Sequence, residues 1–253
     1  MTAIRVVSLD VGWTLVYPRA SLWETAAALC TEAGAPTPPK ACEDLVRALS
    51  AHGQQQAEQL LHDGATYSDS DAQFAAMFEQ MARLMFTQFG VADGHGELVQ
   101  RFVARFWNER NWALFPDTID VLTTLRDGGF IVGVLSNAPT SMRGFLERFG
   151  IAPYLDFTVI SAIEGIKKPD RRIFESALQR AGVAPHEALH VGDMYLEDVI
   201  GGRAAGLHTL LIERGERALF PNHRESHGRD MDPRSVVSDL TQVLERLHLR
   251  GAG

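Results

Sequence analysis

Cysteine is scarce in this sequence, which contains only Cys30 and Cys42 among its 253 residues. Two cysteines at this spacing fit neither a disulfide framework nor a zinc site, so we expect both to be buried thiols. Long apolar runs are also missing, because no stretch approaches the roughly 18 residues that a membrane span requires. Arg5 and Asp10 interrupt the apolar start of the chain, which is not typical of a secretory signal. The sequence therefore predicts a cytoplasmic protein with no membrane partner.

An excess of positive charge is absent as well, since the sequence has 24 Lys and Arg but 32 Asp and Glu, for a formal net charge of −8. Proteins that bind nucleic acids present stripes of Lys and Arg to the phosphate backbone, so we expect no nucleic-acid partner. A small anionic substrate stays compatible with this balance, because a local cluster of side chains decides its binding. The hydrophobic content of 45% is enough to bury a core and an additional module. The sequence does not indicate an oligomeric state.

The pattern of apolar residues divides the chain at about residues 17 and 112. Ser21-Leu22-Trp23-Glu24 forms a capping box, which predicts the start of a helix. Apolar residues recur at helical spacing over 74–89, including Met77 and Leu84, and again over 98–106, which predicts two further helices with buried stripes. We therefore expect a helical insert and a surrounding core, with the insert at residues 17–112 and the core at residues 1–16 and 113–253.

Outside the insert, short apolar runs alternate with helical patterns. This alternation is typical of an α/β fold with a doubly wound parallel sheet. The predicted strands cover residues 4–10, 131–136, 157–160, 188–192 and 208–212. The predicted helices cover residues 117–126, 140–149, 170–181, 198–205 and 233–249, and a long polar loop covers residues 213–233.

Polar residues stand where the predicted strands end, and the carboxyl ends of parallel strands meet along one edge of a sheet. These residues are Asp10, Ser136, Asn137, Lys168, Asp193 and Asp198. Several carboxylates at a buried edge imply a bound cation, because an unpaired buried charge is costly. Ser136, Asn137 and Lys168 offer hydrogen-bond donors to an anion. A nucleophile, a metal site and an anion clamp together predict phosphoryl transfer.

The four segments that contain these residues resemble motifs one to four of the haloacid dehalogenase (HAD) superfamily. They are Asp10-Val11-Gly12-Trp13-Thr14-Leu15, Leu135-Ser136-Asn137, Gly165-Ile166-Lys167-Lys168-Pro169-Asp170, and Gly192-Asp193 followed by Glu197-Asp198. All four occur in order, and the resemblance covers nearly the whole chain. It implies a Rossmann-like HAD core with a helical cap domain, here the insert, and a hydrolase that acts on a small phosphorylated substrate.

The resemblance implies catalytic roles for Asp10, Lys168 and Thr14. Asp10 would attack phosphorus, Lys168 would neutralise Asp10 and the transferring phosphoryl group, and Thr14 would orient Asp10 and its loop. Ser136 and Asn137 would bind the substrate phosphate through their side chains and through N–H groups near the next helix.

A Mg²⁺ site is also implied, because Mg²⁺ prefers hard oxygen ligands and keeps several waters. Its ligands would be Asp10, the carbonyl of Gly12, Asp193 and Asp198, with Asp198 as a direct ligand or as a support for the others. Gly12 would also bind substrate, since a glycine lets the backbone approach a ligand closely. Glu197 is expected to point to solvent.

Gly12 departs from the pattern of HAD phosphatases, which usually have a second Asp two residues after the nucleophile. That carboxylate protonates the leaving group and later activates water, a contribution of about 10²–10⁴-fold. Gly12 cannot supply it, so a residue of the insert or solvent must replace it, or the enzyme is slow. The sequence therefore predicts a Mg²⁺-dependent phosphatase that works through an aspartyl-phosphate and favours good leaving groups.

Three other functions stay open. A haloacid dehalogenase-type hydrolase also lacks that Asp and needs no metal, but it would leave Asp193 and Asp198 without an evident task. A phosphonate-cleaving enzyme needs an insert lysine to form a Schiff base, and Lys40 is the only candidate. A non-catalytic member that binds a phosphoryl group or a protein would keep Asp10 only as a ligand.

Overall fold

The structure, a computed structural model, describes residues 3–45, 48, 69–91, 96–215 and 232–248. Its contacts divide the chain into two compact units. The core unit contains Met1–Tyr17, Thr66–Ser70 and Leu114–Gly253, and the helical unit contains Pro18–Ala65 and Asp71–Ala113. The division into a helical cap domain at residues 17–112 and a core at residues 1–16 and 113–253 stays a prediction. Asp69 and Ser70, however, lie inside the predicted insert and belong to the core unit.

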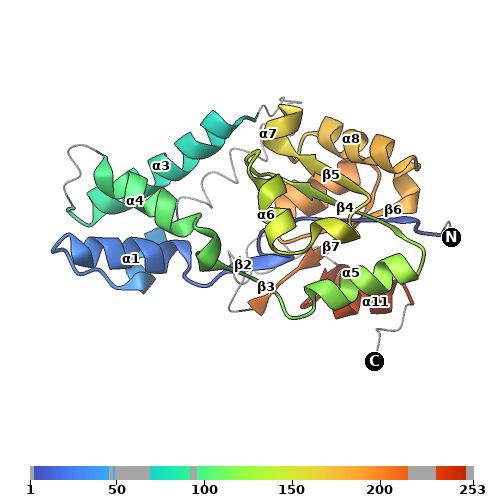
Figure 1. Ribbon diagram of the computed structural model, residues 1–253, viewed down its shortest axis with the longest axis horizontal. Helices are drawn as coiled ribbons and strands as arrows, with labels where there is room; N and C mark the ends of the chain where they lie inside the picture. Colours follow the sequence, from blue (N-terminus) through green and yellow to red (C-terminus); the bar gives the residue numbers. More distant parts are fainter. Residues whose placement is uncertain (1–2, 46–47, 49–68, 92–95, 216–231, 249–253) are drawn as a thin grey trace. The chain divides into compact units, whose positions relative to one another are not determined.

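The described residues of the core unit form a parallel six-stranded sheet (Figure 1). In spatial order its strands are β5 (Phe157–Ile160), β4 (Ile131–Ser136), β1 (Val6–Leu9), β6 (Ala188–Gly192), β7 (His208–Ile212) and β8 (Val236–Val237). Leu9 pairs with Val134 on one side and with Val191 on the other. The residues that follow these three central strands therefore meet at one edge of the sheet, and the predicted α/β fold is confirmed.

Helices cover both faces of this sheet. On one face α5 (Thr118–Asp127) packs with α11 (Thr241–Arg246), and α8 (Arg171–Ala181) covers the other face (Figure 1). Helix α8 packs there with the short helix α9 (Gly201–Ala204). Phe174 of α8 is completely buried in a core cluster that includes Leu135 and Val159 of the sheet. The short elements of the core unit are α6 (Met142–Arg148), η2 (Ala152–Tyr154), α7 (Ser161–Glu164), η3 (Pro185–Glu187), η4 (Tyr195–Ile200) and η6 (Pro233–Ser235).

The helical unit contains α1 (Leu22–Glu32), α3 (Asp71–Gln88) and α4 (Glu97–Phe106), which pack against one another, together with a helical stretch at residues 39–45. The predicted capping box at Ser21 is present at the start of α1. Cys30 and Cys42 are buried free thiols, as predicted. The short elements near the second boundary are η1 (Glu109–Asn111) and β3 (Trp112–Leu114), which pairs with β2 (Val16–Pro18).

The buried stripe of α3 is narrower than predicted. Phe78, Ala82 and Met85 are buried, but Met77 is 51% exposed and Leu84 is 43% exposed. The buried residues follow helical spacing and form the side of α3 that packs in this unit. Met77 and Leu84 therefore lie outside the core to which the sequence assigned them.

The final helix predicted over residues 233–249 is present only in part, as α11 over Thr241–Arg246. Val236 and Val237 instead form β8, which pairs with β7 at the sheet edge and buries Val237. Pairing of two β-branched residues with a sheet edge, and burial of one of them, outweighs helix propensity here. Asp239 then accepts hydrogen bonds from Thr241 Oγ1 and the Gln242 N–H, where α11 begins.

The polar loop predicted over residues 213–233 lies mostly outside the described residues. Among the helices that the structure describes, none combines the length and apolarity needed to cross a membrane.

Candidate functional site

Lys168 lies at the centre of the predicted site, with its ammonium group between two carboxylates. Nζ donates to Asp10 Oδ1 at 2.9 Å, to Asp198 Oδ1 at 2.5 Å and to the Leu135 carbonyl at 3.1 Å. The side chain of Lys168 is 2% exposed. Burial alone would lower the pKa of Lys168, but the charges of Asp10 and Asp198 raise it above its ordinary value. Lys168 therefore stays protonated and holds a positive charge next to Asp10, the predicted nucleophile.

Asp10 follows β1 and is 8% exposed. Burial raises its pKa above the ordinary value, the charge of Lys168 opposes that effect, and the charge of Asp198 adds to it. A side-chain hydrogen bond with Ser136 also favours the ionised form. Lys168 and Ser136 therefore help to keep Asp10 available as a nucleophile.

Asp198 uses both of its oxygens inside the protein. Oδ1 accepts from Lys168 and from His190 Nε2 at 2.9 Å, and Oδ2 accepts from the Met194 N–H at 2.9 Å. His190 Nδ1 lies 2.9 Å from Ser8 Oγ, so each ring nitrogen has a polar partner. Burial disfavours the ionised form of Asp198, but Lys168 and His190 hold its pKa well below the ordinary value. Asp198 is thus better placed to orient Lys168 than to bind a cation directly.

Asp198 reaches Lys168 from the π-helical turn η4, and it passes directly over Gly192. A Cβ atom on Gly192 would lie 2.2 Å from Asp198 Cγ, so the close approach requires glycine. The sequence predicted that a helix begins at Asp198, but η4 already begins at Tyr195. The helical stretch therefore starts three residues earlier than predicted, and the Asp198 carboxylate turns inward to Lys168. π-Helical turns of this kind often occur at functional sites.

Asp193 follows β6 and is 6% exposed. Burial raises its pKa well above the ordinary value, and the charges of Asp10 and Asp198 raise it further. Within the described ranges, no other side chain donates a hydrogen bond to Asp193, and no N–H donates to the carbonyl of Gly12. Both groups are therefore available to a ligand.

The donor set fits a magnesium ion. Three carboxylates, those of Asp10, Asp193 and Asp198, surround the single ammonium group of Lys168. When all of them are ionised, the group has an excess of negative charge. No cluster of three or more His, Cys, Asp or Glu side chains placed to hold a metal occurs in the described part of the chain. Mg²⁺ often takes only one or two carboxylates and completes its shell with water. Asp10, Asp193 and the Gly12 carbonyl match that requirement.

The side chain of Asn137 forms hydrogen bonds with the backbone of Lys168. Its Oδ1 accepts the Lys168 N–H at 2.8 Å, and its Nδ2 donates to the Lys168 carbonyl at 3.0 Å. The side chain predicted to bind phosphate is therefore engaged in joining the second and third motifs. Ser136 is 3% exposed and lies against Asp10. Helix α6 begins at Met142, two residues later than predicted.

Arg214 holds the loop that follows Asp10. It donates to the Thr14 carbonyl at 2.6 Å and to Asp117 Oδ2 at 2.7 Å, and it lies 3.9 Å from the centre of the Phe115 ring. The Thr14 hydroxyl is buried and finds no hydrogen-bond partner among the described residues. Trp13 adopts a left-handed φ of 53°, which is costly for a residue with a side chain. The contacts of Arg214 therefore help to stabilise a strained loop beside the nucleophile.

Glu197 does not point to solvent, so that prediction was wrong. Its Oε2 is enclosed and has no hydrogen-bond partner in the described ranges. Burial and the charge of Asp198 raise the pKa of Glu197 to about 7. The turn of η4 buries Leu196, Asp198 and Val199 and draws Glu197 inward with them.

The sequence interpretation missed His190, Ser8 and Arg214. His190 and Ser8 are directly paired in neighbouring strands β6 and β1. A polar residue inside each of two apolar runs was a signal that could have found them. Arg214 gave no comparable signal, because its partners Asp117 and Thr14 are distant in the sequence.

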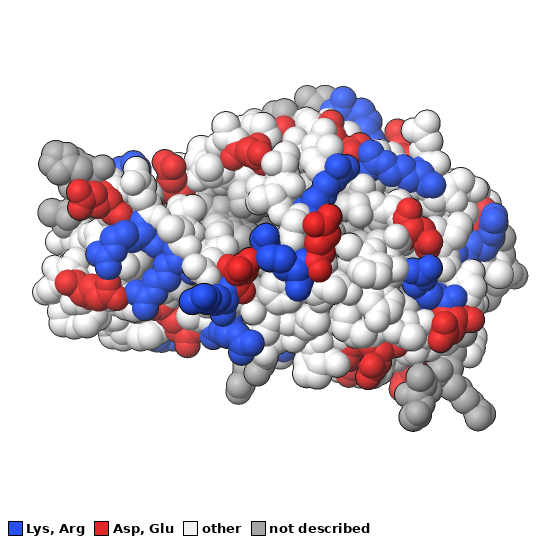
Figure 2. Space-filling model, viewed as in Figure 1, with Lys and Arg blue, Asp and Glu red and all other residues white. Residues whose placement is uncertain are grey.

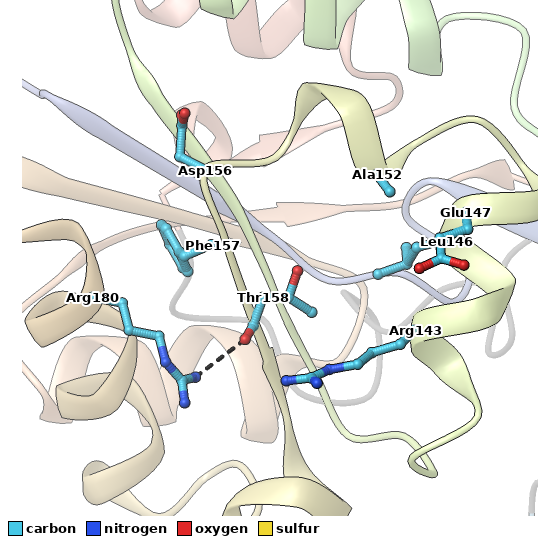
Figure 3. Close-up of a pocket in the computed structure, with 8 residues that line it drawn as sticks. All are labelled: Arg143, Leu146, Glu147, Ala152, Asp156, Phe157, Thr158 and Arg180. Atoms are coloured by element: carbon cyan, nitrogen blue, oxygen red, sulfur yellow. Dashed lines mark hydrogen bonds between the residues drawn. The ribbon is translucent and has the colours of Figure 1, made fainter.

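A cavity of about 500 Å³ lies elsewhere in the core unit, beside the start of the edge strand β5 (Figure 3). Arg180 donates to the Thr158 carbonyl there at 3.1 Å, and Arg143 extends toward the same strand (Figure 3). The cavity shares no lining residue with the site formed by Lys168, Asp10, Asp193 and Asp198. On the molecular face shown in Figure 2, basic and acidic side chains are interspersed.

Comparison with known proteins places these motifs in context. A family model described as haloacid dehalogenase-like hydrolase matches residues 7–206. The human haloacid dehalogenase-like hydrolase domain-containing protein 3 is 30% identical over 246 residues, which cover 96% of this chain and 94% of that protein. The glyceraldehyde 3-phosphate phosphatase of Methanothermobacter thermautotrophicus is 35% identical over 134 residues, 53% of this chain and 58% of that protein.

Among solved structures, an L-2-haloacid dehalogenase matches with a TM-score of 0.70 and 21% identity, over 98% of this chain and all of that one. At this identity the likeness concerns the fold alone.

Proposed function

The chain belongs to the haloacid dehalogenase-like hydrolase family, and from that premise we propose that it is a Mg²⁺-dependent phosphatase of a small phosphorylated metabolite. A relative named as a phosphatase supports this substrate class. The observation that carries the proposal is the group of three buried carboxylates, those of Asp10, Asp193 and Asp198, around the ammonium group of Lys168. An anionic pocket with one ammonium group requires a further cation before it can accept a phosphate.

The protein would hold that cation with Asp10, Asp193 and the Gly12 carbonyl. Bound Mg²⁺ would neutralise the site and orient the phosphoryl oxygens. Lys168, which Asp198 and Asn137 keep in place, would add a positive charge at the same position.

The reaction has two steps on this chain's own residues. An oxygen of Asp10 attacks phosphorus, the bond from phosphorus to the leaving oxygen breaks, and the leaving group departs as an alkoxide or phenolate that then takes a proton from solvent. Water then attacks the aspartyl-phosphate, which releases inorganic phosphate and a proton and restores the Asp10 carboxylate. Ser136, which lies against Asp10, would contact the transferring group.

Gly12 leaves both steps without the usual acid and base. A Cβ atom added at Gly12 would meet no atom within 4 Å, so the place where a second carboxylate would begin is open. The leaving oxygen must therefore depart largely unprotonated, which favours aryl over alkyl phosphates. The helical unit would act as a cap domain and select the substrate, since selection in such architectures depends on loops and inserts. We expect the reaction to occur in the cytoplasm, without a nucleic acid or a membrane.

A dehalogenase is the second candidate, because a dehalogenase shares the fold and Gly12 is compatible with that chemistry. It needs no metal, and it would leave Asp193 buried without a cation. A non-catalytic member of the family would also keep the site but would show no turnover.

The test is a panel of aryl and alkyl phosphates with Mg²⁺, with EDTA, and with EDTA followed by excess Mg²⁺. We expect hydrolysis that is lost in EDTA, restored by Mg²⁺ and abolished by Asp10→Asn, while the exposed control Asp127→Asn retains it. Release of halide from 2-haloacids in EDTA would favour the dehalogenase instead. Absence of turnover on both panels, with phosphate still bound, would favour the binding protein.

A further inference from the structure

Asp69 is a buried carboxylate that the reaction does not use. It is 7% exposed and lies two residues before helix α3, in the short segment that belongs to the core unit. Its Oδ2 accepts the Ser161 hydroxyl at 2.5 Å, and its Oδ1 accepts the Ser70 N–H at 2.9 Å. The Asp69 N–H donates to the Gly165 carbonyl at 3.2 Å. Asp69 is therefore attached to both ends of helix α7.

Ser161 connects Asp69 to the loop after β4 through hydrogen bonds of its side chain. Its side chain is completely buried, and its oxygen accepts the Ala138 N–H at 2.8 Å while its proton goes to Asp69. The Ala162 N–H also donates to the Ala138 carbonyl, at 3.3 Å. A hydroxyl that donates to a carboxylate becomes a better acceptor, so the bond to Ala138 is strengthened by the charge on Asp69.

Ala138 directly follows Asn137, whose amide holds the backbone of Lys168. Lys168 in turn donates to Asp10. A continuous series of hydrogen bonds and peptide links therefore runs from Asp69 to the proposed nucleophile.

From this series we propose that Asp69 and Ser161 are positioning residues that set the loop of Ser136, Asn137 and Ala138. The loop that faces the phosphate is then anchored by a segment the sequence places inside the helical insert. The catalytic consequence rests on the proposed function, because it assumes that this loop contacts a phosphoryl group. The structural consequence does not, because it concerns only how the Ala138 N–H is held.

The structural arm measures hydrogen exchange at the Ala138 amide by NMR. Asp69→Ala and Ser161→Ala should each speed exchange there by at least tenfold, and the double variant should add little, because both remove the same link. Asp69→Asn keeps an oxygen that can accept the Ser161 hydroxyl, so it should recover much of the protection. The exposed control Asp127→Ala should leave the Ala138 amide unchanged. Unchanged exchange in folded Asp69→Ala, or in Ser161→Ala if Asp69→Ala fails to fold, overturns the inference.

The functional arm measures kcat, KM and inhibition by inorganic phosphate with Mg²⁺ in excess. Asp69→Ala should raise KM and the phosphate inhibition constant about tenfold, while the Mg²⁺ concentration for half-maximal rate stays within twofold. Rescue by Asp69→Asn marks a positioning role rather than general destabilisation. Equal kinetics in Asp69→Ala and wild type overturns the catalytic consequence. If the wild type hydrolyses no phosphate, the proposed function fails, and the exchange arm alone then decides the inference.

Discussion

Replacement of Lys168 by Met tests the electrostatic centre of the site. Met has a similar length but no charge, so Lys168→Met leaves Asp10 and Asp198 buried side by side without their shared cation. Removal of one partner from a buried ion pair typically costs about 3–5 kcal/mol. This ammonium group contacts two carboxylates whose side chains are 11% and 1% exposed. We therefore expect a loss of that size in the free energy of unfolding at pH 7 without metal.

The cost should depend on pH in a defined direction. Without the cation the folded-state pKa values of Asp10 and Asp198 rise, so the folded variant holds protons that the unfolded chain releases near pH 4. Stability is then fully present below about pH 4 and is lost as the pH rises through the folded-state pKa values. In the wild type Asp198 stays ionised far into acid, because its pKa lies well below the ordinary value. The difference between the two proteins should therefore grow from pH 4 to pH 8.

The assay is urea unfolding followed by circular dichroism, in EDTA, from pH 4 to pH 8. Lys167→Met is the matched control, because it removes the neighbouring lysine, and it should change stability by no more than about 0.5 kcal/mol. A loss below about 1 kcal/mol at pH 7 for Lys168→Met, or a loss that is equal at pH 4 and pH 8, would refute the reasoning.

Three further outcomes are expected. Asp193→Asn should raise the Mg²⁺ concentration for half-maximal activity more than tenfold, and Asp198→Asn should raise it less while it lowers the thermal midpoint of unfolding. Titrations in which Asp198→Asn weakens Mg²⁺ binding more than Asp193→Asn does contradict the ligand assignment. Gly12→Asp should speed alkyl phosphate turnover and shrink the pre-steady-state burst of leaving group, and equal rates across leaving groups in the wild type would point to an acid and base elsewhere. Glu197→Gln should stabilise the metal-free protein at pH 8 but not at pH 4, because the wild-type pKa of about 7 makes ionisation costly only as the pH rises; an equal gain at both pH values in urea unfolding would disprove that burial.

The sequence alone determined the strands and the family. Apolar runs of four to seven residues predicted β1, β4, β5, β6 and β7, because such runs form buried parallel strands. Parallel strands bring their carboxyl ends together, so Asp10, Lys168 and Asp193 could be grouped without coordinates. These inferences depend on local patterns, which the chain displays directly.

Only the tertiary structure decided what each polar side chain contacts. Asn137 faces the Lys168 backbone, Glu197 is drawn inward, and Asp69 anchors Ser161, although the sequence indicated none of these. Val236 and Val237 likewise became a strand because β7 had an open edge beside them. The reason is physical: a buried polar group takes whichever partner the folded chain brings within about 3 Å, and that partner can lie a hundred residues away.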